Sequence, residues 1–465
     1  MKPVLLIDFG STYTKLTAVD VEHETLLGTA ASYTTVSTDI NEGLGNALAK
    51  LEEKTGKLQY ADCYACSSAA GGLRMITSGL VPELTGEAAK LASLGAGAKV
   101  VRVYAFQLTE DDIEDIAREK PDIFLLVGGT DGGNTANILH NARMLATIKP
   151  EFPVVIAGNR TAARECERIL KDQGFETYIC PNVMPKFGQL QVEPTQKVIR
   201  EIFLNRIIHA KGLSKASELL SDIMMPTPAA VLQAMDLLAQ GCDGEEGIGE
   251  LIAVDVGGAT SDVYSITDGM PEGMNTVYKG LPEPYSKRTV EGDIGMRYSI
   301  TGVAEAAGLA ALAQTAGLTE DRAQELITYL SQHTDTVPGD DPELQALDYG
   351  VACMAVREAV RRHAGTMEET YTMMGKTYVQ SGKNLTRVKN IVVTGGSLIH
   401  AEAPEKIAAY ALYDPSQPES LRPLKSDVLV DKTYILAAMG LLSSYYPQAA
   451  LRIMKKELKV YETGK

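Results

Sequence analysis

Two stretches of the chain place an aspartate and a small-residue turn directly after an apolar run. The first is Asp8-Phe9-Gly10-Ser11-Thr12, with Lys15 shortly after the turn. The second is Asp255-Val256-Gly257-Gly258-Ala259-Thr260-Ser261-Asp262, in the other half of the chain. Backbone N–H groups in such a turn form a cradle for an anion. A carboxylate beside an anion site indicates a cation as well, and Mg²⁺ with a phosphate is the usual pairing.

Both stretches have the pattern of a β-hairpin, because polar and apolar side chains alternate after each turn. Their recurrence suggests that a lobe of the protein is duplicated within the chain. Two such hairpins facing each other across a cleft would clamp a polyphosphate, with Asp8 and Asp255 on a shared Mg²⁺. The alternative is that these aspartates only cap turns or form surface pairs. The predicted cradle residues are Gly10, Ser11, Thr12, Gly257, Gly258, Thr260 and Ser261.

A third stretch suits the organic part of a nucleotide. A predicted buried strand at 388–393 ends in Thr394-Gly395-Gly396-Ser397, and a helix is expected to follow. Glycines in this position let the backbone approach a planar base or a ribose closely. Gly395, Gly396 and Ser397 are therefore predicted to contact the nucleoside.

The elements that position these stretches belong to a large α/β protein. The chain has 465 residues, which predicts two to four lobes, and its net charge of −16 argues against a nucleic-acid surface. No apolar run approaches the length of a membrane span, and we expect a cytoplasmic protein. Of the six cysteines, only Cys63 and Cys66 form a C-x-x-C pair. Buried thiols in a reducing cytosol are the favoured interpretation, and a redox pair or half a metal site is the alternative.

Residues from about 97 to 183 alternate predicted strands with predicted helices, which indicates a parallel α/β unit of their own. The loop Gly128-Gly129-Thr130-Asp131-Gly132-Gly133-Asn134 follows a buried strand and opens a helix there. Ligands of parallel sheets bind at this kind of position. The loop does not match G-x-G-x-x-G, so a plain tight turn and a binding loop are both open.

Taken together, these stretches resemble the ATPase family that contains actin, the sugar kinases and the DnaK-type chaperones. The two hairpins resemble the family's two phosphate motifs, and 394–397 resembles its adenosine motif. The helices of about 227–241 and 434–443 resemble its two connecting helices. This resemblance implies an α/β fold with two actin-like lobes, each ribonuclease H-like, plus the parallel α/β insertion. We expect the first lobe at 1–242 plus about 427–465, and the second lobe at 250–426.

A closer resemblance is to the MutL/GlmL family, which is unrelated to the mismatch-repair protein of similar name. It rests on the first hairpin, the loop at 128–134, and the segments 66–73 and 290–297, and it spans essentially the full chain. Members accompany adenosylcobalamin-dependent glutamate mutase and aminomutases. The resemblance implies an ATP-driven accessory or reactivating factor that would release damaged cobalamin from an inactivated mutase.

The mechanism implied by both resemblances uses ATP or ADP with Mg²⁺. Asp8 and Asp255 would hold the metal ion, Lys15 would neutralise phosphate charge, and Asp255 or Asp262 would orient the attacking water. The main alternative is a small-molecule kinase of the same fold. An actin-like structural protein and a binding module that docks through the insertion are further alternatives. The chain has no Asp-x-His-x-x-Gly motif, so direct ligation of cobalamin is not expected.

Overall fold

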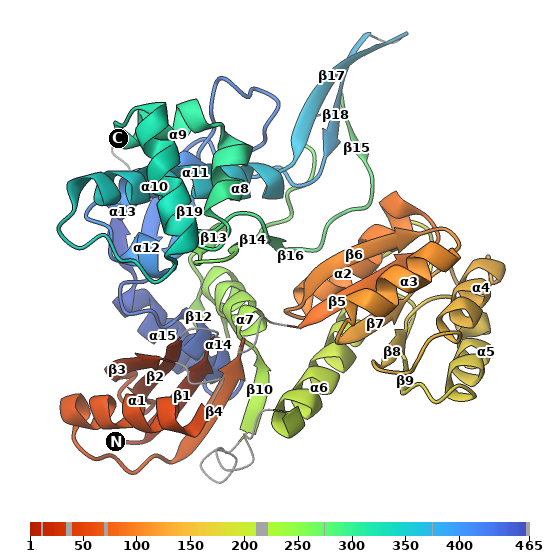
Figure 1. Ribbon diagram of the computed structural model, residues 1–465, viewed down its shortest axis with the longest axis horizontal. Helices are drawn as coiled ribbons and strands as arrows, with labels where there is room; N and C mark the ends of the chain where they lie inside the picture. Colours follow the sequence, from red (N-terminus) through yellow and green to blue (C-terminus); the bar gives the residue numbers. More distant parts are fainter. Residues whose placement is uncertain are drawn as a thin grey trace. The chain divides into compact units, whose positions relative to one another are not determined.

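The structure is a computed structural model that describes residues 1–10, 13–33, 40–68, 73–210, 222–273, 275–373 and 375–461. The described chain forms two compact units (Figure 1). Unit 1 contains Met1–Ala234, Gly280–Pro282 and Ala437–Ala450. Unit 2 contains Met235–Lys279, Glu283–Leu436 and Leu451–Lys465. The chain passes from unit 1 to unit 2 within helix α7 (Thr227–Gln240).

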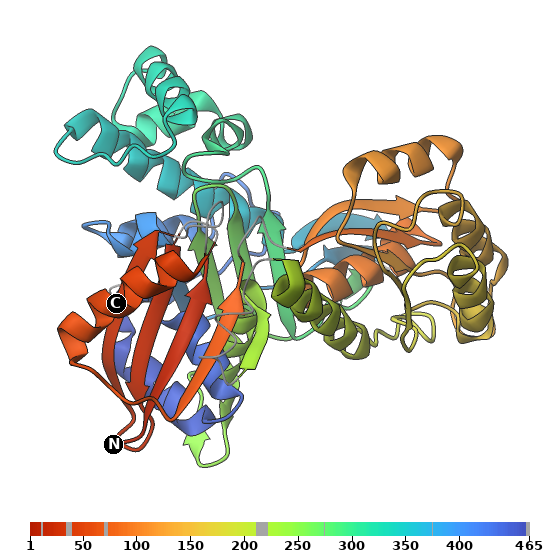
Figure 2. The same cartoon turned by 60° about the horizontal axis from the view of Figure 1, so that its bottom comes forward.

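The main sheet of unit 1 has the strand order β10-β4-β1-β2-β3. Strands β1, β2 and β3 are antiparallel neighbours, whereas β4 and β10 run parallel to β1. Helix α1 (Ile40–Thr55) lies across this sheet (Figure 2) and shares a core with it through Leu44 and Leu51. The strands are β1 (Pro3–Phe9), β2 (Tyr13–Asp20), β3 (Thr25–Tyr33), β4 (Asp62–Ser67) and β10 (Asp222–Pro226).

The main sheet of unit 2 repeats this arrangement in the order β16-β14-β13-β19-β20-β21. Here β13, β14 and β16 are antiparallel neighbours, and β19 and β20 run parallel to β13. The strands are β13 (Leu251–Val256), β14 (Ser261–Ile266), β16 (Ser286–Glu291), β19 (Asn390–Thr394), β20 (Asp427–Val430) and β21 (Lys459–Tyr461). Two sheets of this order in one chain are the duplicated ribonuclease H-like core of the actin-like ATPases. The predicted fold class is confirmed.

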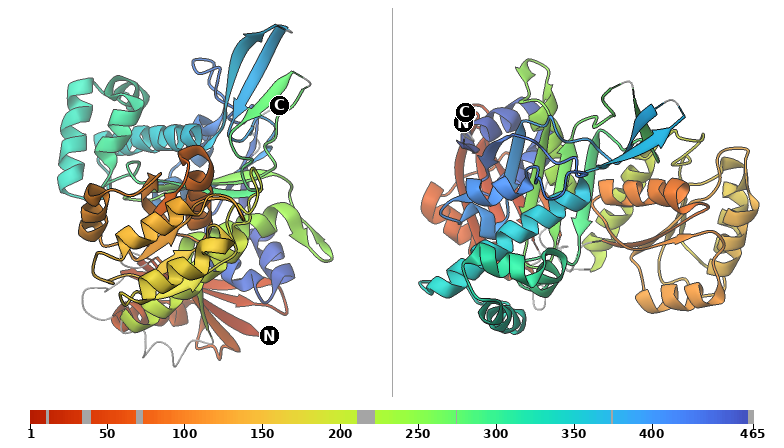
Figure 3. Two further views of the ribbon diagram at one scale, coloured as in Figure 1. Left: turned by 90° about the vertical axis from the view of Figure 1, so that its right-hand side faces the viewer. Right: turned by 90° about the horizontal axis from the view of Figure 1, so that it is seen from above.

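Helix α11 (Pro342–His363) is the central helix of unit 2 (Figure 3). It begins at Pro342 because the Asp341 carboxylate accepts hydrogen bonds from the N–H groups of Glu343 and Leu344, and proline suits the first turn of a helix. The surrounding helices are α8 (Ile300–Ala307), α9 (Leu309–Ala316), α10 (Glu320–Gln332), α12 (Gly396–Ile399) and α13 (Pro404–Ala408). A separate three-stranded sheet consists of β15 (Thr276–Lys279), β17 (Thr366–Thr372) and β18 (Gly375–Ser381).

The insertion in unit 1 is a five-stranded parallel sheet of order β6-β5-β7-β8-β9. Its strands are β5 (Arg74–Gly79), β6 (Lys99–Ala105), β7 (Ile123–Leu126), β8 (Val154–Ile156) and β9 (Thr177–Ile179). Its helices are α2 (Glu87–Gly95), α3 (Glu110–Glu119), α4 (Ala136–Leu145), α5 (Arg160–Lys171) and α6 (Glu193–Ala210). The insertion starts at β5 and not near residue 97, because β5 pairs with both β6 and β7 in this sheet.

The C-terminal segment, expected in the first lobe, is divided between the units. Helix α14 (Leu436–Ser443) contributes Ala437 onward to unit 1, whereas β20 and β21 extend the sheet of unit 2. Helix α15 (Pro447–Glu457) crosses the same boundary after Ala450. Gly440 of α14 lies against α7, where an added Cβ would be 1.8 Å from the Ala230 carbonyl oxygen. In the described part of the chain, no helix is long and apolar enough to span a membrane.

Candidate functional site

Asp8 lies at the end of β1, where the first predicted phosphate turn begins. Gly10 makes the turn tight, since its N–H donates to the Tyr13 carbonyl and a Cβ there would lie 2.5 Å from that oxygen. In the β1–β2 register Asp8 stands opposite Lys15, and Lys15 Nζ is 3.8 Å from Asp8 Oδ2. The structure therefore brings these two predicted residues together. Ser11 and Thr12 lie outside the described residues.

Two partners of Asp8 come from distant parts of unit 1. The Thr227 hydroxyl, at the start of α7, donates to Asp8 Oδ1 at 2.6 Å. The Cys66 thiol, on β4, donates to the same oxygen at 3.5 Å. These contacts hold a carboxylate that is only 6% exposed. Sequence analysis missed both partners, because nothing in the local pattern links residues 66 and 227 to residue 8.

The Cys63 and Cys66 thiols do not form a joint site. Both lie on β4, where side chains alternate between the two faces of the sheet, so residues three apart point to opposite faces. Burial raises the pKa of Cys63 to about 12 and raises that of Cys66 well above its usual value, with the Asp8 charge adding to the shift for Cys66. The favoured interpretation of buried protonated thiols agrees with this placement.

In unit 2, Asp255 lies at the end of β13 with predicted site residues on both neighbouring strands. Asp262 of β14 stands opposite it in one register, and Thr394 of β19 stands opposite it in the other. Gly395 follows Thr394 and has φ 99°. A Cβ on Gly395 would be 2.9 Å from Asp255 Oδ1 and 2.5 Å from the Val256 carbonyl oxygen. The structure therefore brings three predicted site residues, Asp255, Asp262 and Gly395, together at one edge of this sheet.

Gly395 and Gly396 offer a matched pair of substitutions. Gly395→Ala is expected to destabilise the protein and to displace Asp255, because its backbone is left-handed and the Cβ has no room. Gly396→Ala is expected to be tolerated, because within the described residues no atom beyond its chain neighbours lies within 4 Å of its Cβ position. Thermal melting would show a clear drop in Tm for the first variant and almost none for the second. Equal melting temperatures would contradict the placement of Gly395 against Asp255.

Asp262 is paired with a buried arginine from β16. Arg288 Nη2 lies 2.6 Å from Asp262 Oδ1, and Arg288 Nε donates to the same oxygen at 2.8 Å. The guanidinium side chain is 4% exposed. Burial lowers the pKa of Arg288, but the Asp262 carboxylate and the neighbouring Tyr264 together outweigh burial, and the pKa is raised. Sequence analysis missed Arg288, because the β14–β16 pairing that brings it to Asp262 was not predicted.

The segment 292–299 supports the second predicted phosphate turn. The N–H groups of Met296 and Arg297 donate to the carbonyls of Gly257 and Gly258, and the Ser261 hydroxyl donates to the Ile294 carbonyl. These bonds engage carbonyl groups of the turn and leave Gly258 and Ala259 exposed. Among the described residues, no acceptor takes the N–H groups of Gly258 and Ala259. The turn is thus held in a shape that offers amide hydrogens to an anion.

Arg297 also fixes the segment 292–299 in place, because its guanidinium donates two hydrogen bonds to the carboxylate of Asp348 on α11. Gly295 permits the close approach, since its Cβ would lie 2.8 Å from the Gly258 carbonyl oxygen. The segment resembling the MutL/GlmL family at 290–297 therefore supports the turn structurally.

The turn at 394–397, predicted to contact the nucleoside, is fixed by hydrogen bonds to the buried carboxylate of Asp431. Its carboxylate accepts hydrogen bonds from the Thr394 hydroxyl at 3.2 Å and from the Ile435 N–H at 2.9 Å. Asp431 is 1% exposed, so it fixes the end of β19 to the start of α14. Gly396 is exposed at the turn itself and Ser397 is partly exposed. Both are therefore accessible to a ligand, whereas Gly395, the third residue predicted to contact the nucleoside, is buried.

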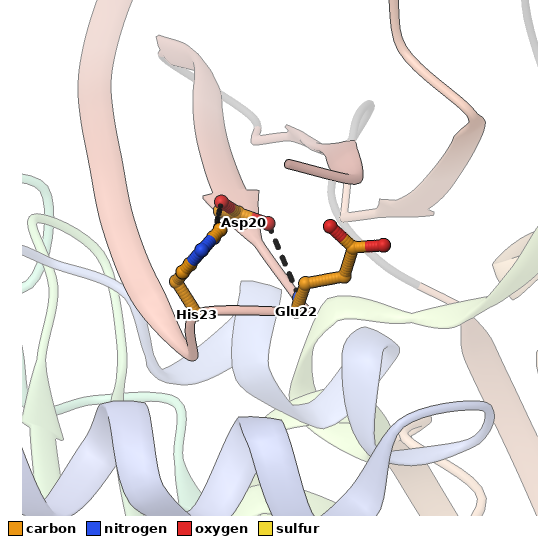
Figure 4. A group of neighbouring side chains, drawn as sticks. All are labelled: Asp20, Glu22 and His23. Carbon is orange, nitrogen blue, oxygen red and sulfur yellow. Dashed lines mark hydrogen bonds and ion pairs between the residues drawn. The ribbon is translucent and has the colours of Figure 1, made fainter.

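A cluster with metal-ligand side chains lies at the opposite end of β2 from the first turn. Asp20, Glu22 and His23 lie close together there (Figure 4). Asp20 Oδ1 already accepts hydrogen bonds from the N–H groups of Lys2 and Glu22, and Asp20 Oδ2 pairs with His23 Nδ1 at 2.5 Å. Burial raises the pKa of Asp20, but these hydrogen bonds outweigh it and lower the pKa to about 2. Asp20 thus ties down the β2–β3 turn and the N-terminal segment.

Comparison with known proteins identifies the family. A family model described as MutL protein matches residues 4–458. Protein MutL of Clostridium tetanomorphum is 47% identical over 460 residues, which covers 98% of this chain and 99% of that protein.

Two solved structures are more distant. Xylulose kinase from Bifidobacterium adolescentis has a TM-score of 0.37 and 11% identity, over 100% of this chain and 97% of that one. Component A of (R)-2-hydroxyglutaryl-CoA dehydratase from Acidaminococcus fermentans has a TM-score of 0.30 and 10% identity, over 97% of this chain and 100% of that one. Similarities this weak do not bear on activity. The 47% identity with Protein MutL along nearly the whole chain, together with the family model, establishes the family. The chain belongs to the MutL protein family.

Proposed function

We propose that this protein is an ATP-hydrolysing accessory factor that reactivates an adenosylcobalamin-dependent mutase of the glutamate mutase or aminomutase type. The observation that carries the ATPase part is the repeated placement of an aspartate. Asp8 and Asp255 occupy the same position, at the end of the first strand of each ribonuclease H-like sheet, with a tight glycine turn after each. Both hairpins would serve the same nucleotide.

The residues of unit 1 suit the phosphate end of that nucleotide. Lys15 is about a quarter exposed beside Asp8, so its ammonium can neutralise phosphate charge while Asp8 keeps the ammonium in place. The Thr227 hydroxyl fixes the orientation of Asp8. An aspartate held in this way is positioned before any ligand arrives, which reduces the cost of ordering it.

Carboxylate oxygens at both turns fit a hard cation, because Mg²⁺ prefers oxygen ligands and keeps several waters. Asp8 and Asp255 would hold Mg²⁺, which would supply neutralisation of the phosphate charge that develops during transfer. Gly395 supports this role at Asp255, since any side chain there would press on the carboxylate.

We propose Asp255 for orienting the attacking water, in preference to Asp262. Oδ1 of Asp262 accepts two hydrogen bonds from the buried Arg288 guanidinium, so Asp262 is committed to an ion pair. An aspartate in that position is better suited to hold the β14 end of the turn. The exposed N–H groups of Gly258 and Ala259 would bind phosphate oxygens, and Gly395, Gly396 and Ser397 would contact the adenosine.

The client enzyme follows from the family resemblance alone. Members of this family accompany cobalamin-dependent mutases, and a factor of this kind would use ATP hydrolysis to release damaged cobalamin. A cytoplasmic location and the absence of a nucleic-acid partner are part of the same proposal.

The decisive experiment incubates the protein with an inactivated glutamate mutase, free adenosylcobalamin and Mg–ATP. Mutase activity is expected to return, and ADP is expected to form. The matched control replaces ATP by a non-hydrolysable analogue, which should leave the mutase inactive. Unrestored mutase activity together with phosphorylation of a small metabolite would favour the small-molecule kinase instead.

A further inference from the structure

The inserted sheet of unit 1 has a topological switch point that the proposed ATPase does not use. In its order β6-β5-β7-β8-β9, the first strand of the insertion lies between the second and the third. Connections from β5 and β7 therefore leave the sheet in opposite directions at their carboxyl ends, and open α/β sheets bind ligands in the crevice this creates. The loop 128–134 follows β7 at this point.

Two asparagine side chains hold the loop at 128–134 by hydrogen bonds to its carbonyl groups, while part of its backbone is exposed to solvent. Asn159, which is fully buried, donates from Nδ2 to the carbonyls of Gly133 and Asn134. Asn182 donates to the Gly129 carbonyl at 3.0 Å. Gly132, Gly133 and Asn134 are nevertheless exposed. The loop is thus a fixed surface with its backbone presented to solvent.

Helix α4 starts at this loop; the Asn134 side chain caps only the N–H of Asn137, and Thr135 makes no side-chain cap. Within the described residues, no acceptor takes the N–H groups of Ala136 and Ile138, in its first turn. In the helices on either side, the N-cap residue itself supplies the side-chain cap, Thr109 for α3 and Asn159 for α5. Free N–H groups at a helix start favour an anion such as a phosphate.

An independent sign of a ligand is the amide of Asn137. Its side chain is 4% exposed, and its Oδ1 has no hydrogen-bond partner among the described residues. This oxygen points at the first residue of the loop, where a Cβ on Gly128 would be 3.1 Å from it. A buried acceptor without a donor destabilises the folded protein. A ligand that carries a hydroxyl or a ring N–H would remove this destabilisation.

Ser78 adds a second unpartnered group on the neighbouring strand of the switch point. Its side chain is fully buried near the carboxyl end of β5, and its Oγ has no partner in the described chain. Strands β5 and β7 are joined here, because the Val127 N–H donates to the Ser78 carbonyl. Ser78 and Ile76 are two residues apart on β5, so their side chains lie on the same face of the sheet. Ile76 shares a core with Ile138 of α4. Ser78 is therefore on the sheet face that α4 covers.

An exposed aromatic residue follows the adjacent strand. Phe106 comes directly after Ala105, which pairs with Gly79 of β5, and Phe106 is 60% exposed. Its backbone has φ 66°, which is strained for a side chain of this size. Asn141 of α4, one helical turn beyond Asn137, holds it by donating to the Phe106 carbonyl at 3.0 Å. A planar ring would stack on such a side chain.

We propose that this switch point of the inserted sheet binds a nucleotide-like phosphate ester, as a second ligand site distinct from the predicted ATP site. The phosphate lies at the start of α4, and a hydroxyl or ring N–H of the organic part donates to Asn137. Phe106 provides a platform for the ring. The interpretation of the loop 128–134 as a plain tight turn explains neither Asn137 nor Ser78.

The test uses the full-length protein and two pairs of probes. FMN is compared with riboflavin, and AMP with adenosine, by fluorescence and by isothermal titration calorimetry. At least one ester is expected to bind more tightly than its phosphate-free counterpart. Asn137→Asp is expected to weaken that binding by about tenfold or more, because it adds a negative charge beside the phosphate without changing side-chain shape. Asn384→Asp, in unit 2, is the matched control and should bind normally, since Asn384 Oδ1 already accepts from the Thr386 N–H.

Asp255→Asn separates the two sites, because it should leave binding of the ester unchanged. The proposal is overturned if neither ester binds, if Asn137→Asp binds as well as the unaltered protein, or if binding is lost in Asp255→Asn instead. Circular dichroism monitors folding of each variant. If Asn137→Asp melts early, Phe106→Gly replaces it, because glycine adopts the left-handed backbone freely and only the ring is lost. This variant should weaken the ester and leave inorganic phosphate unaffected, and unchanged ester binding would also overturn the proposal.

Discussion

Asp8→Asn and Asp255→Asn are each expected to reduce ATP hydrolysis by on the order of a hundredfold or more, while the protein remains folded. A metal ion and its carboxylate ligands stabilise the transferring phosphate by several kcal/mol, and about 1.4 kcal/mol corresponds to a factor of ten. Asparagine keeps the shape of the side chain, so Asp8→Asn can still accept the hydrogen bond of Thr227. The effect therefore isolates the lost charge.

The measurement is the steady-state release of phosphate from ATP as Mg²⁺ is varied. Both variants should need more Mg²⁺ and should reach a lower maximal rate. Asp172→Asn is the matched control, because it also removes one negative charge, but at an exposed position of unit 1. This variant should hydrolyse ATP normally. Full hydrolysis by both site variants would refute the proposed roles of Asp8 and Asp255. Loss in only one of them would mean that the two hairpins do not serve one nucleotide.

Much of the framework behind this experiment was predictable from local sequence patterns. Each hairpin has an apolar strand, an aspartate and a glycine turn within about a dozen residues, and local patterns of this kind define β-hairpins well. The duplication followed from comparing the two stretches, and it predicted two like sheets. The parallel insertion was predictable because its strands are short apolar runs separated by helices. The structure agrees with all three.

The partners of the site aspartates were not predictable, because they depend on strand order. Thr227 reaches Asp8 only because β10 joins the sheet beside β4 and delivers the start of α7 to that edge. Arg288 reaches Asp262 only through the pairing of β16 with β14. A periodic pattern specifies an element but not its neighbours. The start of the insertion at β5 was missed for a related reason, since Arg74–Gly79 has little alternation and ends in a glycine.

The division of the C-terminal segment shows the same limit on a larger scale. Residues 427–430 form an apolar strand whose pattern fits either sheet, and only the pairing with β19 assigns it to unit 2. Helix α14 is apolar on all sides, and its Gly440 packs closely against Ala230 of α7. The resemblance predicted a connecting helix at about 434–443 but not the unit in which the strand before it lies.

The ion pair between Arg288 and Asp262 leads to the largest expected change in stability. Asp262→Asn is expected to lower the free energy of unfolding by about 3–5 kcal/mol, because it leaves a buried guanidinium without its counter-charge. The side chains of Arg288 and Asp262 are 4% and 15% exposed, so water cannot replace the lost partner fully. Urea denaturation followed by circular dichroism measures the loss.

Glu343→Gln is the matched control, because it breaks the ion pair with Arg322 in the same unit at a site where the side chains are 43% and 48% exposed. Exposed pairs contribute roughly 0.2–1 kcal/mol, so this variant should unfold almost as the unaltered protein does. The double variant Asp262→Asn with Arg288→Met should recover part of the stability, since it removes the unpaired charge and keeps a long apolar side chain in its place. If Asp262→Asn costs no more than Glu343→Gln, Arg288 is not held by this pair, and Asp262 becomes as strong a candidate as Asp255 for orienting the attacking water.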